Sequence, residues 1–375
     1  MKKVVVMALL FLLFLNTEAQ ERKRVSSYWT SFVQGLDIIS KKEKKFKITA
    51  SVKVETNEKE AWAGVWARVD NKNEETGFFD NMGDRPIKSN EWQTYSIEGV
   101  INSNSKRLNF GGICMMNGKF YFDDYKLFIE NDKGVLEAVS INNNGFEKEV
   151  SNGAIPKWSY GISKTNKREV EGYEITSIQD AAEGGFALLI EGRNIKNTMA
   201  IGKYEGASPQ IGAMITMLEN LKTRVVNRVQ GLSQYEIDHL HDEKANRIGA
   251  LVMHLAAAEA YYQVFTFEGR GFNEDEKKKW ESALNLGEKA REEFKGHDIN
   301  YYLDIYSEVR AKTIEELKKR NDAWFEKTPP GRSISNHFSW FHVMEHQSSH
   351  LGQILFLAKR IPPEPEVVIP KKELD

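Results

Sequence analysis

The sequence predicts a multi-domain protein with two unlike parts, an N-terminal all-β jelly-roll sandwich and a C-terminal all-α four-helix bundle. In the first part, short apolar and aromatic runs of strand length alternate with clusters of Gly, Asn and Asp. Even spacing of such runs is typical of sandwiches and jelly rolls. From Pro209 onward, apolar residues recur at every third or fourth position, which is the period of a helix. A polar linker over residues 198–208 separates the two patterns.

The chain begins with a pattern typical of a signal peptide. Lys2 and Lys3 precede an apolar run over residues 4–15, which is too short to span a bilayer, and small residues follow at positions 17–19. We therefore expect residues 1–19 to be cleaved and the bacterial protein to be exported to the periplasm, the cell envelope or the medium. An uncleaved membrane anchor is the alternative. After cleavage we expect no association with a membrane.

Composition excludes several classes of function. The formal net charge is −2 with both signs interspersed, so we expect no basic face for nucleic acid or for an anionic membrane. Cys114 is the single cysteine, so the fold must depend on burial of apolar surface rather than on an internal disulfide. A chain of 375 residues is long enough for two or three domains of that kind.

Strand-like runs continue beyond the first block of the N-terminal part. The first block predicts strands at residues 46–55, 61–69, 92–97, 108–115 and 119–129. A second block of apolar runs follows over residues 144–192. Half a sandwich of that length would bury too little surface to be stable alone, which favours one sandwich over residues 25–197. Two modules, the second truncated, are the alternative.

Two stretches carry a resemblance. FFDNMGDRPIKSNEWQTYSIEGV at residues 78–100 and GKFYFDDYKLFIE at residues 118–130 resemble a jelly-roll module of the galactose-binding or carbohydrate-binding-module type. The runs in residues 144–192 resemble the opening strands of such a module, and residues 46–130 resemble its closing strands. The resemblance implies a circularly permuted sandwich over residues 25–197. It implies a fold and does not name a ligand.

Ligand sites in the sandwich stay open at this point. Four tryptophans are available to stack on a sugar ring: Trp62, Trp66, Trp92 and Trp158. Aromatic residues at alternating strand positions usually pack inward, so a core role is the favoured interpretation. Asp80 and Asp84 with Arg85 are candidates for binding a ligand or Ca²⁺, with a turn-stabilising network as the favoured alternative. Asp123 with Asp124 could form a loop ion pair or a structural calcium site, and both stay open. A glycan or a small molecule is the expected partner.

Helical periodicity predicts a bundle over residues 209–361. Ser208 is a good N-cap and Pro209 a good first helical residue. The predicted helices cover residues 209–229, 244–267, 274–294, 302–324 and, from Ser333 or Ser335, the chain up to Arg360. Three prolines then stop the last helix, and residues 362–375 are expected to form a disordered tail.

Histidines carry the predicted chemistry. His346 and His350, within HVMEHQSSHLGQILFLAKR, are four residues apart and therefore one turn apart on the same helix face. His254 lies within the apolar run RIGALVMHLAAAEAYY. Three imidazoles can bind Zn, Ni or Fe(II) and leave a coordination position open, as catalytic sites do. A satisfied core histidine or a solvent-facing pair is the alternative that spacing alone leaves open.

His254 with Glu259, and HQSSHLGQI at residues 346–354, resemble the DinB/YfiT-like bundle family. The resemblance implies a four-helix fold in which His254, His346 and His350 bind a divalent transition metal, zinc before nickel or iron. Glu259 is then a candidate general base or a residue behind the ligands, with a surface ion pair as the favoured alternative. The remaining residues near these motifs are expected to be structural or solvated: His239, His241, His342 and Glu345.

Three functions remain open. The first is an exported metal-dependent hydrolase that uses metal-activated water, with the sandwich holding a glycan or another substrate. The second is a non-enzymatic binding or stress-associated protein with a structural or vestigial metal, which a fourth ligand such as His342 or Glu259 would favour. The third is a thiol-dependent S-transferase, as some DinB/YfiT-like relatives are. Export weighs against the third, because small thiols are mainly cytoplasmic. Whether the protein forms a homodimer stays open.

Overall fold

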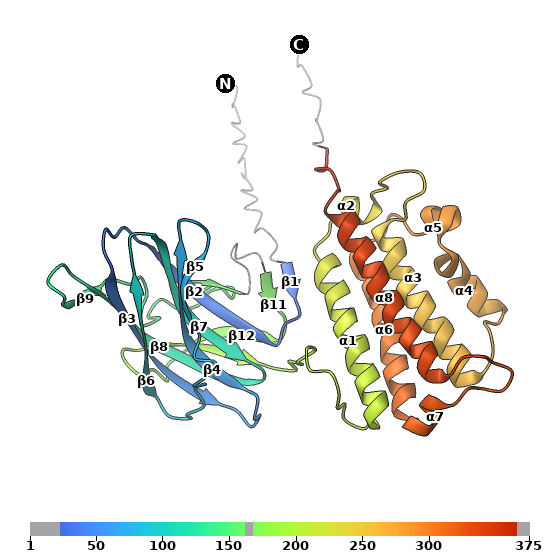
Figure 1. The fold of residues 1–375 in the computed structure, drawn as a ribbon, viewed down its shortest axis with the longest axis horizontal. Helices are drawn as coiled ribbons and strands as arrows, with labels where there is room; N and C mark the ends of the chain where they lie inside the picture. Colours follow the sequence, from blue (N-terminus) through green and yellow to red (C-terminus); the bar gives the residue numbers. More distant parts are fainter. Residues whose placement is uncertain (1–22, 162–167, 366–375) are drawn as a thin grey trace, which may run out of the picture.

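The structure is a computed structural model, and it describes residues 23–161 and 168–365. The predicted signal peptide and residues 366–375 of the predicted tail lie outside the described residues. Figure 1 shows an all-β part in blue to green beside a helical part in yellow-green to red, so the predicted fold class is confirmed. No helix in the described ranges combines the length and apolar character that crossing a bilayer requires.

Two antiparallel sheets form the sandwich. The first has the strand order β10-β2-β7-β4-β5: β10 (Ser159–Tyr160), β2 (Trp29–Asp37), β7 (Ser105–Met115), β4 (Trp62–Asn71) and β5 (Thr76–Asp80). The second has the order β12-β13-β8-β3-β6: β12 (Tyr173–Ile178), β13 (Ala187–Gly192), β8 (Gly118–Glu130), β3 (Lys44–Glu55) and β6 (Gln93–Ile101). Strand β9 (Leu136–Val139) pairs with β8, and β1 (Lys23–Val25) pairs in parallel with β11 (Arg168–Val170).

Strands from both predicted blocks share these sheets. β10 extends the first sheet along β2, and β13 lies between β12 and β8 in the second. Residues of the second block therefore complete the sandwich that the first block begins. The five predicted strands correspond to β3, β4, β6, β7 and β8. β2 was not predicted, because polar residues and Gly35 interrupt its apolar residues.

The sandwich core is rich in aromatic rings. Phe32 packs edge-on against Phe122, Phe146 and Trp158, with ring centroids 4.9, 5.8 and 5.4 Å away. Trp158 is 6% exposed, so the core interpretation holds for this tryptophan. Edge-to-face packing places the positive edge of one ring against the negative face of another, which is favourable beyond simple burial.

The acidic candidates of the sandwich have structural partners. Asp80 forms an ion pair with Arg85 and accepts the backbone N–H of Met82, so it stabilises its own turn as expected. Asp123 is fully buried and accepts the N–H groups of Ala182 and Glu183 from a distant loop. These donors stabilise the buried carboxylate directly, which makes Asp123 a loop anchor.

Four long helices make the bundle: α1 (Pro209–Val229), α3 (Ile248–Gln263), α6 (Ile299–Lys318) and α8 (Asn336–Ala358). Residues of α3 are buried on almost every side, as expected of a helix that is apolar all round. Helices α6 and α8 pack against α3, and α1 packs against α6 and α8 (Figure 1). Apolar residues that recur along α1 at helical spacing are fully buried: Ile211, Ile215, Leu218, Val225 and Val229.

Short elements between the long helices differ from the prediction. Helix α2 (Gln234–Asp238) lies between the first two predicted helices, where no helix was predicted. The predicted helix over residues 302–324 ends at Lys318, before α7 (Asp322–Glu326). The predicted helix over residues 274–294 is divided into α4 (Glu274–Asn285) and α5 (Gly287–Glu293). Leu286 lies between them with a φ of 55° and a ψ of −148°, outside the helical region, so the helix is interrupted there. Helix α3 begins at Ile248, and its last turn continues as a π-helix, η1 (Val264–Glu268).

Candidate metal centre

The structure brings His254, His346 and His350 together. His254 extends from α3, and the other two extend from one face of α8. The Nε2 atom of His346 lies 3.1 Å from Nε2 of His254 and 3.1 Å from Nε2 of His350. One nitrogen from each ring lies within 4.8 Å of the others. His254 is 7% exposed, and the other two rings are half-buried.

Carbonyl groups determine which ring nitrogens carry protons. Nδ1 of His254 lies 2.9 Å from the backbone oxygen of Ala283 on α4, and Nδ1 of His350 lies 3.0 Å from Oε1 of Gln353. A carbonyl oxygen only accepts hydrogen bonds, so both Nδ1 atoms donate and both Nε2 atoms present lone pairs. These lone pairs point at His346 Nε2, which can supply a proton to only one of them. A cation would satisfy all three, so the donor set fits a divalent transition metal.

Burial keeps the three imidazoles neutral at physiological pH. Loss of water, followed by the neighbouring imidazoles of His350, His254 and His342, lowers the pKa of His346 to about 3. Burial also lowers the pKa of His254 and of His350. Metal ligation requires the neutral ring, and the site therefore holds its histidines in the ligating form.

His342 lies beside the triad without joining it. Its Nδ1 is 2.8 Å from Oε1 of Glu345, its ring centroid is 5.6 Å from that of His346, and its side chain is 40% exposed. Within the described ranges, the group of His, Cys, Asp and Glu residues close enough to share one ion comprises the three histidines alone. The position of His342 therefore agrees with the expected surface-facing role, and Glu345 is its partner.

His239 and His241 lie in the loop that follows α2. Their rings contact one another, with centroids 5.9 Å apart, and His241 is exposed. Neither ring belongs to the metal-binding group. His241 is thus solvated as predicted, whereas His239 is half-buried and its ring also contacts Tyr235.

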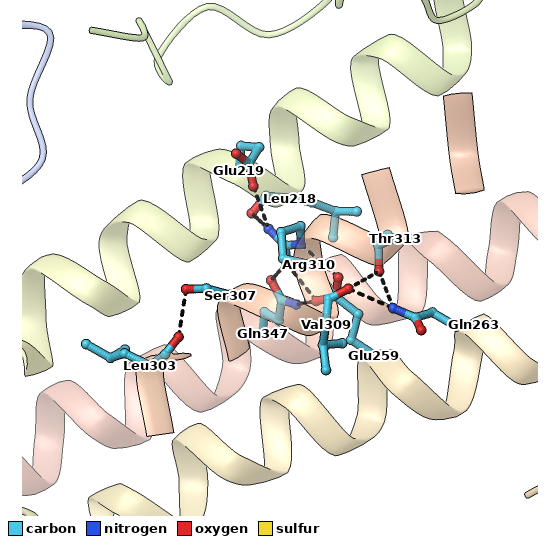
Figure 2. A network of polar contacts seen from close by, with 10 residues as sticks. All are labelled: Leu218, Glu219, Glu259, Gln263, Leu303, Ser307, Val309, Arg310, Thr313 and Gln347. Carbon is cyan, nitrogen blue, oxygen red and sulfur yellow. Dashed lines mark hydrogen bonds and ion pairs between the residues drawn. The ribbon is translucent and has the colours of Figure 1, made fainter. Parts of the chain in front are cut away.

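Glu259 lies elsewhere than expected. It is fully buried, so the predicted surface ion pair is wrong in its location. Its Oε1 and Oε2 are each 2.8 Å from a nitrogen of Arg310, and Oε2 also accepts the side-chain amide of Gln347 at 2.9 Å (Figure 2). Both carboxylate oxygens of Glu259 therefore accept hydrogen bonds from buried donors. Glu259 is a structural residue and does not belong to the metal-binding group.

Arg310 and Gln347 were not singled out from the sequence, although a signal was present. Arg310 occupies a position of the buried stripe of α6, whose other members recur at three and four residues: Leu303, Tyr306, Thr313 and Leu317. A charged residue at such a position must find a buried partner. The partner could not be identified from spacing, because Glu259 belongs to a different helix.

A cleft of about 830 Å³ lies on the outer face of the first sheet. Alternate residues of β2, β4 and β7 line it, as expected when one face of a sheet points outward. Trp62 and Trp66 are among them. Trp92 directly precedes β6, the edge strand of the second sheet, and its indole N–H donates to Asp180 at 3.1 Å. Trp158 lies in the core.

Trp66 lines the cleft and is fixed by hydrogen bonds to the sheet backbone. Its indole N–H is shared between the carbonyl oxygens of Phe32 and Gly112, at 3.3 and 3.2 Å. Gly111 faces the same side of the sheet between Val33 and Trp66, and a Cβ there would overlap the carbonyl oxygen of Phe32. The backbone of β2 and β7 thus holds Trp66 in place at the edge of the cleft.

Comparison with known proteins agrees with the helical architecture. The model of the mycothiol-S-transferase family matches residues 213–361, less than half of the chain, and this range contains all three histidines. The predicted resemblance of the helical part to this DinB/YfiT-like group is confirmed over that range. No curated protein matches the chain.

Among solved structures, the CBM22-1 xylan-binding domain of Paenibacillus barcinonensis Xyn10C is similar at 13% sequence identity and a TM-score of 0.17. The alignment covers 23% of this chain and 61% of that domain, so the chain spans less than two thirds of its length. A similarity this low carries no information on the ligand.

Proposed function

We propose that the helical part is a divalent-metal centre that activates a small thiol for S-transfer, with the metal held by His254, His346 and His350. The convergence of two lone-pair-bearing Nε2 atoms on a third carries this proposal. Three neutral imidazoles favour Zn, and Ni or Fe(II) also suit them. A metal bound there supplies positive charge that lowers the pKa of a thiol or of a water.

The protein's own residues leave room for such a ligand. His342 is engaged by Glu345, and Glu259 is engaged by Arg310 and Gln347. Neither joins the metal-binding group, which favours a three-ligand site over a closed structural one. Ala283 and Gln353 hold two of the rings in the ligating tautomer, so the ligands are oriented before a metal binds.

The family match favours a thiol over water as the activated group, since the matched family is named mycothiol-S-transferase. Hydrolysis by metal-activated water at the same site is the alternative. We also propose that residues 1–19 direct export. Export would favour the hydrolysis alternative, because small thiols are mainly cytoplasmic. A structural metal in a non-enzymatic protein is the remaining alternative.

Zinc-loaded protein tests these alternatives. We expect loss of free thiol when the protein is given a small thiol together with an electrophilic aromatic halide, and no loss with His346→Ala/His350→Ala. Hydrolysis of a chromogenic ester in the absence of a thiol would instead support the hydrolase function. Metal binding with neither reaction would favour the non-enzymatic protein.

We propose a second function, glycan binding, for the sandwich cleft. Beside Trp66, polar side chains form a chain of hydrogen bonds: Arg68 to Asp70 at 2.6 Å, and Asn109 to Asp70 at 2.8 Å. A flat aromatic face with fixed polar groups beside it suits the C–H face and the hydroxyl groups of a sugar ring. The observation favouring this function is that Trp66 lines the cleft beside these polar side chains.

Soluble polysaccharides and their oligosaccharides are suitable probes for this cleft. We expect binding of at least one, and about tenfold weaker binding by Trp66→Ala, as the loss of one stacking contact implies. Trp92→Ala is the matched control, because Trp92 lies outside the cleft and donates to Asp180. Equal loss in both variants, or no binding by the wild type, would contradict this second function.

A further inference from the structure

Arg310 connects all four long helices of the bundle. From α6, its guanidinium donates to the backbone oxygen of Leu218 and lies 3.3 Å from Glu219, both on α1. It also donates twice to Glu259 on α3 and once, at 3.1 Å, to Oε1 of Gln347 on α8. Figure 2 shows these contacts converging on one guanidinium. We call Arg310, Glu259 and Gln347 the buried junction.

Stability alone does not account for the buried junction. Arg310 is 1% exposed and Glu259 is 0% exposed, so both charges have lost their water. Buried ion pairs repay that loss only partly, and apolar replacements of similar volume are often neutral or stabilising. What such groups can provide is a fixed register between helices, because hydrogen bonds are lost on small shifts that apolar contacts tolerate.

Register between α3 and α8 is what the histidine site needs. The apolar face of α3 consists largely of Ala, Val and Leu side chains, which discriminate weakly among neighbouring registers. The 3.1 Å separation of His254 and His346 depends on that register. With a rise of about 1.5 Å per residue, a slip of one residue would separate ligands that metal binding must hold to within about 0.2 Å.

Gln347 joins the junction to the site. It follows His346 directly in α8. Its amide nitrogen donates to Glu259 at 2.9 Å, and its amide oxygen accepts from Arg310. Only a side chain with both a donor and an acceptor can serve a carboxylate and a guanidinium at once. Glu259 in turn lies five residues beyond His254, about 7.5 Å along α3.

We propose that the buried junction is a positioning device for the histidine site: Arg310 and Glu259 hold Gln347, and thereby fix α8 against α3 where His346 meets His254. The residues act through register and do not touch the metal. This inference rests on the proposed metal centre, and it adds residues that set its geometry.

Co²⁺ alone is a suitable probe, titrated into the metal-free full-length protein against a competing chelator, with the visible spectrum recorded. We expect Gln347→Leu to weaken Co²⁺ binding by about tenfold to a hundredfold and to change the spectrum, as loss of a residue that orients ligands does. Gln263→Leu is the matched control. Gln263 is also a buried glutamine of the bundle, but it donates to Val309 and Thr313 of α6 and so does not join α3 to α8. It should retain both the affinity and the spectrum.

A third variant tests the proposal even if Gln347→Leu fails to fold. Glu259→Leu/Arg310→Met/Gln347→Leu replaces the whole junction by apolar groups and should stay folded. We expect it to bind Co²⁺ more weakly than the wild type, with an altered spectrum. Wild-type affinity in this variant or in a folded Gln347→Leu would overturn the junction proposal, as would equal weakening by Gln263→Leu. No Co²⁺ binding by the wild type would instead overturn the metal centre itself.

Discussion

His346 makes the stability of the metal-free protein depend on pH. Its pKa is 6.5 as a free side chain and about 3 in the folded protein, where burial and the neighbouring imidazoles oppose its charge. The unfolded chain therefore binds more protons than the folded one between these values, and stability is lost as the pH falls through that window. Protonation of His254 and His350 acts in the same direction.

We predict that the free energy of unfolding of the metal-free protein, from urea titrations, decreases between about pH 7 and pH 4. His346→Gln should make this decrease shallower, and His239→Ala/His241→Ala should leave it unchanged, because those rings are outside the triad. A His346→Gln variant with the wild-type pH dependence would contradict the assignment.

Gly111 on β7 allows the close approach of β2 to β7. Any Cβ at residue 111 overlaps the carbonyl oxygen of Phe32, so Gly111→Ala must move β2 or β7. We predict a loss of about 1–3 kcal/mol of unfolding free energy, measured in urea. Gly352→Ala is the control, since that helical position has no neighbour within 4 Å. It should gain about 0.5–1 kcal/mol. Equal effects of the two variants would contradict the close approach at Gly111.

At the scale of single residues, the sequence predicted the triad better than the cleft. His346 and His350 are four residues apart on one helix, and His254 is a polar residue in an apolar run, so both signals are local. The four tryptophans look alike in sequence. Trp66 differs from Trp92 and Trp158 through its hydrogen bonds to Phe32 and Gly112, which lie on other strands.

Helix α4 contributes to the triad through its last turn. Ala283 accepts the Nδ1 proton of His254, and Asn273 begins the helix with a capping box that includes Glu276. We predict that Asn273→Ala lowers the unfolding free energy by about 1 kcal/mol and increases amide hydrogen exchange along α4. Exchange that stays at wild-type rates would show that the cap does not stabilise this helix.

At the scale of elements, the periodic patterns predicted the long helices and five strands, but not the short elements. Ser233 and Glu236 form a capping box at α2, a signal that the polar composition of residues 230–242 obscured. The interruption at Leu286 was not predicted from the sequence. Its local signal is Gly287, and a single glycine is compatible with a continuous helix.

The two parts of the molecule contact one another through a paired hydrogen bond. The amide of Asn227 on α1 accepts from the backbone N–H of Ser26 at 2.7 Å and donates to its carbonyl oxygen at 2.8 Å. We predict that Asn227→Ala, which removes both bonds, broadens the distribution of distances in small-angle scattering. Asn220→Ala is the control, since its amide donates to Thr198 in the linker. Unchanged scattering by Asn227→Ala would show that other contacts fix the arrangement.

At the scale of the whole molecule, the change of period near Pro209 predicted the two architectures. The mutual arrangement was beyond the sequence, because Ser26 and Asn227 lie far apart in the chain and carry no local signal. The buried junction was beyond it for the same reason, since its three residues come from three helices.

Elemental analysis of the purified wild type, with and without prior incubation with Zn²⁺, Ni²⁺ or Fe²⁺, tests the metal centre most directly. The geometry predicts about one equivalent of a transition metal per chain, lost in His346→Ala/His350→Ala and retained in His239→Ala/His241→Ala. No bound metal in the wild type after incubation, or an undiminished equivalent in His346→Ala/His350→Ala, would contradict the proposed site.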